Sequence, residues 1–174
     1  IIIYGSKYGT TKKYAEELSR RTNIEAISFK DIKEINHYNK IIYLGGIYAG
    51  GVLGMSSTLK KLDDISNKTT ILITVGLADP KDKENINNIR NNMKRQIKQE
   101  IFEKAKIFHL RGGIDYTKLN VMHKTMMKLL YNAVKKLPEE KKTAEDRAMI
   151  DTYNQKISFV NFSSLDDIIS EIQK

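Results

Sequence analysis

The stretch YGSKYGTTKKYAEEL, residues 4–18, joins the end of an apolar run to the start of an amphipathic pattern. The run itself, IIIYG at residues 1–5, ends in a glycine and is typical of a strand buried on both faces. From Thr10 to about Arg21, Tyr14, Ala15 and Leu18 fall on one side of a predicted helix. The stretch therefore predicts a buried strand, a loop of small and hydroxyl residues, and a helix.

The same alternation continues along the chain. Further strands are predicted at 24–29, 40–46, 69–76, 106–113 and 157–162, and helices near 55–65 and over 83–105. A helical turn is expected at 31–35, and Ser163 or Ser164 is expected to open the last helix. Repeated strand–helix units without hairpin signals predict a parallel sheet with helices on both faces. Residues 114–156 exceed what this alternation needs, so we interpret the chain as a single domain, 1–174, with one insertion.

Composition excludes several classes of site. The chain has 174 residues and no cysteine, which excludes disulfides, thiolate metal sites and a cysteine nucleophile. The three histidines, His37, His109 and His123, lie far apart without ligand spacing, so no metal site is predicted. No apolar run approaches the roughly 18 residues of a membrane span, and no signal peptide is visible. We expect a cytoplasmic protein whose formal charge of +9 attracts anionic partners.

Small residues follow three of the predicted strands. In an open α/β sheet, ligands bind at the carboxyl ends of the strands, and a helix beginning there favours a phosphate group. Gly9 allows close backbone approach, and the hydroxyls of Ser6, Thr10 and Thr11 can donate to phosphate oxygens. The alternative is an ordinary helix cap, in which a threonine satisfies the N–H groups and nothing binds. GGIYAGG at 45–51 and VGLADP at 75–80 follow neighbouring strands, which favours a flat ligand.

At these residues the chain resembles the flavodoxin-like FMN proteins over nearly its whole length. Their phosphate loop, T/S-x-T-G-x-T, matches SKYGTT at residues 6–11, except that Tyr8 replaces the usual second threonine. The resemblance implies a three-layer α/β sandwich with a five-stranded parallel sheet in the order 2-1-3-4-5, and a helical insertion in or before the last strand. It also implies FMN as the cofactor and no catalytic side chain, because the flavin supplies the chemistry.

The resemblance implies that three loops hold the cofactor. The corresponding residues are Ser6, Lys7, Tyr8, Gly9, Thr10 and Thr11 in the first loop, Gly46, Ile47, Tyr48, Ala49 and Gly50 in the second, and Gly76, Leu77, Ala78 and Asp79 in the third. Tyr48 is the best candidate for stacking on the flavin ring, and a position at the rim is the alternative.

Residues 110–130, LRGGIDYTKLNVMHKTMMKLL, resemble a more specific group, the flavodoxin-type protoporphyrinogen oxidases. Those proteins carry a basic, aliphatic insertion here, entered through a turn that corresponds to Gly112 or Gly113 leading to Tyr116. The resemblance implies a porphyrinogen substrate and a quinone acceptor. The alternative is a non-enzymatic electron-transfer protein for an acidic redox partner. A flavin-free nucleic-acid-binding module is disfavoured, because the basic residues are mostly lysines mixed with acids and there is no tryptophan.

The segment 118–137 carries five lysines and no acid. Six of its apolar residues recur at three- and four-residue steps and share one helix face: Leu119, Met122, Met126, Leu129, Ala133 and Leu137. One interpretation is that this face covers the sheet or the flavin edge as part of the core. The other is an interfacial helix that contacts a membrane peripherally, with its lysines on anionic headgroups or propionates and its methionines on an apolar ligand.

Overall fold

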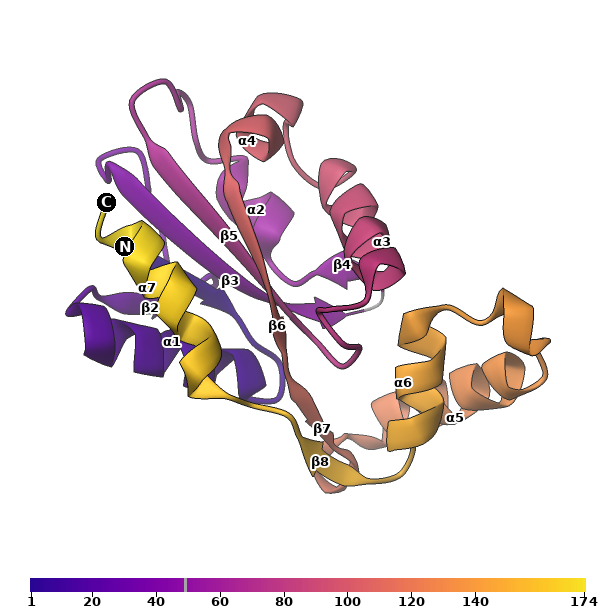
Figure 1. Ribbon diagram of the computed structural model, residues 1–174. Coiled ribbons are helices and arrows are strands. Elements are labelled where there is room, and N and C mark those ends of the chain that lie inside the picture. The colour runs from indigo at the N-terminus through magenta and orange to yellow at the C-terminus, as the bar shows by residue number, and fades with distance from the viewer. Residues whose placement is uncertain (49) are drawn as a thin grey trace.

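The computed structural model describes residues 1–48 and 50–174, and a central parallel sheet runs through it (Figure 1). The parallel strands are β1 (Ile2–Gly5), β2 (Ala26–Ser28), β3 (Lys40–Tyr48), β5 (Thr69–Gly76) and β6 (Lys106–Arg111). They lie in the order β2-β1-β3-β5-β6, and a short strand, β4 (Gly51–Val52), pairs antiparallel with β3. The predicted strand order 2-1-3-4-5 is confirmed, with β4 as an addition.

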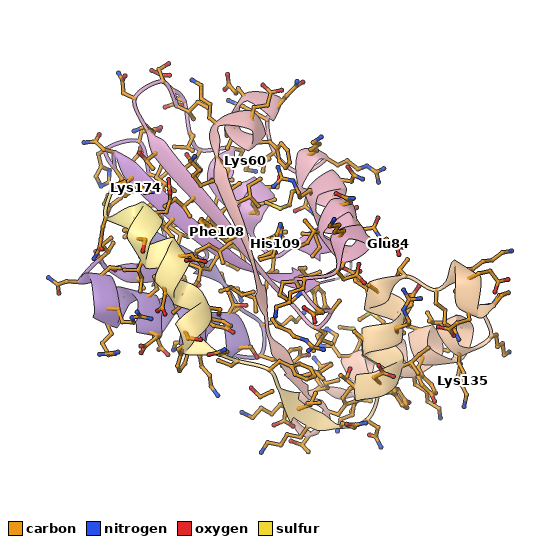
Figure 2. The ribbon with its side chains drawn as sticks, in the orientation of Figure 1. Lys60, Glu84, Phe108, His109, Lys135 and Lys174 are labelled. Carbon is orange, nitrogen blue, oxygen red and sulfur yellow. The ribbon has the colours of Figure 1, made fainter. Side chains whose placement is uncertain are left out.

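Helices cover both faces of the sheet, as predicted. On one face lie α1 (Thr10–Thr22) and α7 (Asp166–Ile172), and on the other lie α2 (Met55–Leu59), α3 (Lys83–Lys94) and α4 (Gln99–Lys104) (Figure 1). Alternate strand residues enter the two cores, so that Ile2 packs on the α1 side and Ile3 on the α2 side. Figure 2 shows the same alternation at the edge strand β6, where Phe108 and His109 point to opposite sides. Burial on both faces explains the uninterrupted apolar runs.

The insertion forms a separate lobe at the end of the sheet where β6 ends, away from the two termini (Figure 1). A two-stranded antiparallel ribbon, β7 (Gly113–Asp115) and β8 (Lys156–Ser158), connects it to the body. Between the strands lie η1 (Tyr116–Lys118), α5 (Val121–Lys135), η2 (Glu139–Lys141) and α6 (Ala144–Thr152). The rings of Tyr131 on α5 and Tyr153 after α6 stack with centroids 3.9 Å apart. We call residues 113–158 the insertion lobe.

The apolar face predicted on 118–137 is not part of the core. Leu119 is buried, but the other five members of that face are exposed: Met122, Met126, Leu129, Ala133 and Leu137. The interpretation of this face as core is therefore wrong. α5 attaches through its other side, where His123 and Val134 are buried.

Three helical predictions need correction. The helix predicted over 83–105 is broken into α3 and α4, because the backbone of Lys98 is not helical (φ −59°, ψ 140°). Gln96, which lies in the break, accepts a hydrogen bond from Val52 N at 3.1 Å. The helix near 55–65 ends at Leu59, and the chain then turns so that Asp63 N donates to Asn36 Oδ1. Residues 31–35 form no helical turn, since the hydrogen-bonded turn lies earlier, where Asp31 N donates to Ser28 O at 2.9 Å.

The last predicted strand, 157–162, is also wrong in part. Only β8 is a strand, and it pairs with β7 instead of joining the central sheet. The chain then enters a 3-10 helix, η3 (Phe162–Leu165), ahead of α7. Asn161 caps η3 by accepting from Ser163 N at 3.1 Å, so neither Ser163 nor Ser164 opens the helix. Across the described part of the chain, none of the helices combines the length and the apolar character needed to cross a membrane.

Candidate functional site

The three predicted loops meet at one edge of the sheet. Gly5 of β1 pairs with Gly45 of β3, and Gly46 pairs with Val75 of β5, so the carboxyl ends of these strands are neighbours. A Cβ on Gly46 would lie 3.0 Å from the Thr11 hydroxyl oxygen, and one on Gly76 would lie 2.9 Å from Ile47 Cδ1. Both glycines therefore permit the loops to touch one another. We call this region the three-loop edge, residues 6–11, 46–48, 50 and 76–79.

The first loop, between β1 and α1, turns at Gly9. Its φ of 93° lies in the left-handed region that favours glycine. Gly9 is the N-cap of α1, and no side chain caps this helix. The threonine cap of the alternative interpretation is therefore not formed. Because the first N–H groups of any helix lack intrahelical partners and carry partial positive charge, the start of α1 favours an anion.

The hydroxyls of the first loop differ in position. Ser6 Oγ accepts a hydrogen bond from Gly9 N at 3.1 Å, which stabilises the turn between these two residues. Thr10 is half-buried as the first residue of α1. Thr11 is only 3% exposed, and its hydroxyl faces Gly46. Ser6 and Thr10 are thus better placed for an external ligand than Thr11.

The second loop begins later than predicted, because the strand expected at 40–46 extends to Tyr48 and is followed by the antiparallel strand β4. β3 continues to Tyr48 and pairs with β4 through Ile47 and Val52 and through Tyr48 and Gly51. Gly50 has a φ of 76° and so takes the left-handed position of the turn. Ala49, the remaining predicted residue of this loop, lies outside the described residues.

Tyr48 is held by side chains from two other elements. Lys7 Nζ lies 4.4 Å from the centroid of its ring. The Tyr48 hydroxyl lies 2.7 Å from His123 Nε2, and the Tyr8 hydroxyl hydrogen-bonds Nδ1 of the same imidazole. Burial raises the pKa of the Tyr8 hydroxyl, and the nearby Tyr48 raises it further, so the Tyr8 phenol stays neutral. We call Tyr8, Tyr48 and His123 the tyrosine–histidine cluster.

His123 comes from the insertion lobe and is only 2% exposed. Each of its two ring nitrogens has a phenol hydroxyl as its hydrogen-bond partner, so one imidazole connects Tyr8 to Tyr48. Asn120 caps α5 and accepts from His123 N at 2.8 Å, which fixes the start of the helix. The sequence analysis considered His123 only as a metal ligand and did not place it beside the predicted loops. Its spacing of eleven residues from Val134, which puts both residues on one side of a helix, is the sequence pattern that accompanies its burial.

The third loop is fixed by two side chains. Arg111, on β6, donates from Nε to Leu77 O at 3.0 Å, and its guanidinium stacks 3.7 Å from the ring centroid of Phe159. The carboxylate of Asp79 accepts from Lys81 N at 2.8 Å, so it belongs to the turn that enters α3. Ala78 is buried. Arg111 is a second residue that sequence analysis missed, because its contact depends on the pairing of β5 with β6.

A family model described as a flavodoxin domain matches residues 1–142. The chain belongs to the flavodoxin domain family. The match covers the sheet, the three-loop edge and α5 of this flavodoxin domain, and it ends between η2 and α6. No curated protein matches the chain in sequence.

Several solved structures are similar to this flavodoxin domain. A flavoprotein of Lactobacillus acidophilus in complex with FMN is 13% identical, with a TM-score of 0.42 over 63% of this chain and 90% of that one. A flavodoxin variant of Fusobacterium nucleatum bound to flavin mononucleotide is 18% identical, with a TM-score of 0.44 over 68% and 71%. Oxidised flavodoxin 1 of Bacillus cereus is 16% identical, with a TM-score of 0.39 over 79% and 97%.

Proposed function

We propose that this flavodoxin domain binds FMN at the three-loop edge and transfers electrons through it. The observation that carries the proposal is the first loop, where Gly9 begins a helix that no side chain caps, beside two glycine-containing loops. The N–H groups at the start of α1 and the hydroxyls of Ser6 and Thr10 would hold the phosphate. Residues 46–50 and 76–79 would flank the ring.

When bound, the flavin supplies the redox chemistry. The chain contributes orientation, because His123 fixes the hydroxyl of Tyr48 and Lys7 covers its ring. It also contributes charge, since Lys7 and Arg111 both lie at the three-loop edge. The proposal needs no side chain of the three-loop edge to transfer a proton, because the flavin itself carries the electrons.

The experiment is a titration of the apoprotein with FMN, followed by flavin fluorescence. We expect saturable quenching at one FMN per chain. Riboflavin, which has the same ring and no phosphate, should bind at least about tenfold more weakly, because charge-assisted hydrogen bonds to phosphate contribute roughly 1.5–3 kcal/mol each. Equal affinity for the two flavins would contradict the assignment of the first loop.

The finer part of the proposal concerns the electron donor and acceptor. The resemblance of residues 110–130 supports oxidation of a porphyrinogen with a quinone as acceptor, and so does the exposed apolar side of α5, a helix that contacts the three-loop edge through His123. The alternative, an electron carrier for an acidic partner, is favoured by the net charge of +9. Turnover of protoporphyrinogen with a soluble quinone would support the enzyme. Rapid reduction by a reductase without such turnover would support the carrier.

A further inference from the structure

A pocket lies beside the break between α3 and α4, on the face of the sheet that α2 covers (Figure 1). Its volume is about 180 Å³, several times the roughly 30 Å³ that one water molecule takes in the liquid. The end of α2 forms one wall, and the break forms the other. We call this cavity the α2–α3 pocket.

The charge of the α2–α3 pocket has one sign. Lys60 follows α2, and Arg95 and Lys98 lie in the break, so three cationic side chains from two segments line one cavity. None of the described residues that line it is acidic. Figure 2 shows Lys60 at the end of α2 that is nearer to α4. Like charges that share a cavity repel one another, and a bound anion removes this repulsion.

In the described part of the chain, no ion pair neutralises these cations. The ion pairs formed by residues 1–48 and 50–174 involve other side chains than Lys60, Arg95 and Lys98. Lys98 Nζ donates to Leu62 O at 3.4 Å, which holds this ammonium group on the side of the pocket where α2 ends. An ammonium group has three donors, so two of them remain for a ligand.

Gln96 adds a neutral donor group that the fold holds in place. Its Oε1 accepts a hydrogen bond from Val52 N at 3.1 Å, which orients the side-chain amide. Because Oε1 is used in this way, the two N–H donors of Nε2 are the part of the side chain that can contact an anion. Cationic donors together with an oriented N–H group suit the oxygens of a phosphate, which only accept hydrogen bonds at full charge.

The pocket lies where the backbone departs from the preference of the sequence. Ile97 and Ile101 continue the helical spacing of Ile89 and Met93, but Lys98 has the non-helical angles φ −59° and ψ 140°. Local sequence preference and the observed backbone disagree most often at functional or strained sites. The break beside the α2–α3 pocket is such a disagreement.

We propose that the α2–α3 pocket binds the phosphate group of a small molecule. The three cationic side chains and the Gln96 amide would contact the phosphate oxygens. Leu59, which is 1% exposed, and Ile97, which is half-buried, form an apolar part of the lining. An apolar group attached to the phosphate would therefore add contact. The pocket shares no lining residue with the three-loop edge, so this site goes beyond the proposed flavin site.

The experiment is a two-dimensional NMR titration of the full flavin-free chain with inorganic phosphate and with phenyl phosphate. Sodium chloride keeps the ionic strength at about 0.1 M throughout, so that screening stays constant. We expect saturable shifts at the backbone amides of residues 95–98 and at the side-chain amide of Gln96. Binding of phenyl phosphate at least about threefold more tightly would assign the site to a phosphate ester. Equal binding would assign it to free phosphate.

The titration also separates the α2–α3 pocket from the flavin site. Phosphate that binds at the start of α1 shifts the amides of Gly9 and Thr10 instead of those of residues 95–98. FMN binding by a chain whose residues 95–98 do not respond to phosphate would contradict the pocket alone. A response of residues 95–98 in a chain that does not bind FMN would contradict the flavin assignment alone.

Two pairs of substitutions test the charged side chains. Arg95→Gln with Lys98→Gln should weaken phosphate binding by at least about tenfold, because two charge-assisted hydrogen bonds are lost. The control is Lys83→Gln with Lys104→Gln, which removes the same charge from exposed positions on α3 and α4 outside the pocket. We expect this control pair to weaken binding by less than about twofold, since its charges act only through screened solvent.

Gln96→Glu is a third variant, and it should retain the fold because a carboxylate still accepts a hydrogen bond from Val52 N. It brings a negative charge into the pocket and should abolish phosphate binding. Three results would overturn the proposal: a native chain without saturable shifts at residues 95–98, equal weakening by the two charge-removing pairs, and undiminished binding in Gln96→Glu.

Discussion

At the scale of single residues, His123 connects segments that are far apart in the chain. Its imidazole contacts Tyr8, 115 residues away, and Tyr48, 75 residues away. We expect His123→Leu to weaken FMN binding by up to about thirtyfold, because two hydrogen bonds that preorganise Tyr8 and Tyr48 are lost, at roughly 1 kcal/mol each. The measurement is the dissociation constant for FMN from fluorescence quenching.

Two controls show whether His123 acts through the tyrosines. The double variant Tyr8→Phe, Tyr48→Phe removes the same hydrogen bonds and should reproduce the loss. Asn120→Ala removes the cap of α5 and should lower stability by about 1 kcal/mol while leaving FMN affinity nearly unchanged. An affinity for FMN that rises in His123→Leu would show that the cluster opposes cofactor binding.

Gly9 provides a test of the phosphate assignment. Nothing lies within 4 Å of a Cβ added there, so Gly9→Ala introduces only the strain of a φ of 93°, about 1–2 kcal/mol. Gly50→Ala is the matched control, because Gly50 also has open space and a positive φ. We expect the preference for FMN over riboflavin to fall in Gly9→Ala and to persist in Gly50→Ala. Equal effects of the two substitutions on that preference would count against a phosphate at α1.

His109 makes stability depend on pH. Its Nδ1 lies 2.7 Å from the hydroxyl of Thr74, and burial, with the charge of Arg90, lowers the pKa of His109 to about 4. Between about pH 6.5, its unfolded pKa, and pH 4 the unfolded chain binds more protons, so stability falls as the pH falls. We expect His109→Asn to remove up to about 3 kcal/mol of this dependence. Parallel stability curves for the two proteins, from urea unfolding, would contradict it.

At the scale of elements, the strands followed from the sequence because apolar runs such as 69–76 end in glycine and are buried on both faces. The break between α3 and α4 did not, because Ile97 and Ile101 continue the helical period of Ile89 and Met93 although the backbone of Lys98 is not helical. The loops of the three-loop edge were predicted because each of them follows an apolar run that ends in glycine. His123 and Arg111 were not, because only tertiary contacts bring them there.

The insertion lobe has its own small core of tyrosines. Tyr153 stacks on Tyr131 and meets Tyr116 edge-on with centroids 5.4 Å apart. We expect Tyr153→Ala to cost the lobe about 2 kcal/mol and to speed amide exchange in α5 and α6 by roughly thirtyfold, with the sheet unchanged. Tyr153→Phe keeps both ring contacts and serves as the control. Faster exchange throughout β3 and β5 would show that lobe and sheet unfold together.

At the scale of the whole molecule, the carboxyl ends of the strands and the insertion lobe converge on one edge (Figure 1). That edge receives residues from the first loop, the β3–β4 hairpin, β6 and α5. The net charge of the chain then matters for any ligand that changes charge there, because interactions over a Debye length of about 10 Å sum many lysines.

A bound flavin gains negative charge when it is reduced, and a chain of charge +9 stabilises that form. One unit charge about 10 Å away contributes roughly 0.4 kcal/mol in water, so several of them act measurably. We expect the midpoint potential of the bound FMN to fall as salt is raised, because salt screens the positive surroundings. Replacing Lys124, Lys128 and Lys135 by glutamine should lower the potential at low salt and flatten its salt dependence. A potential that is indifferent to salt in both proteins would show that contacts within the three-loop edge, and not the net charge, determine it.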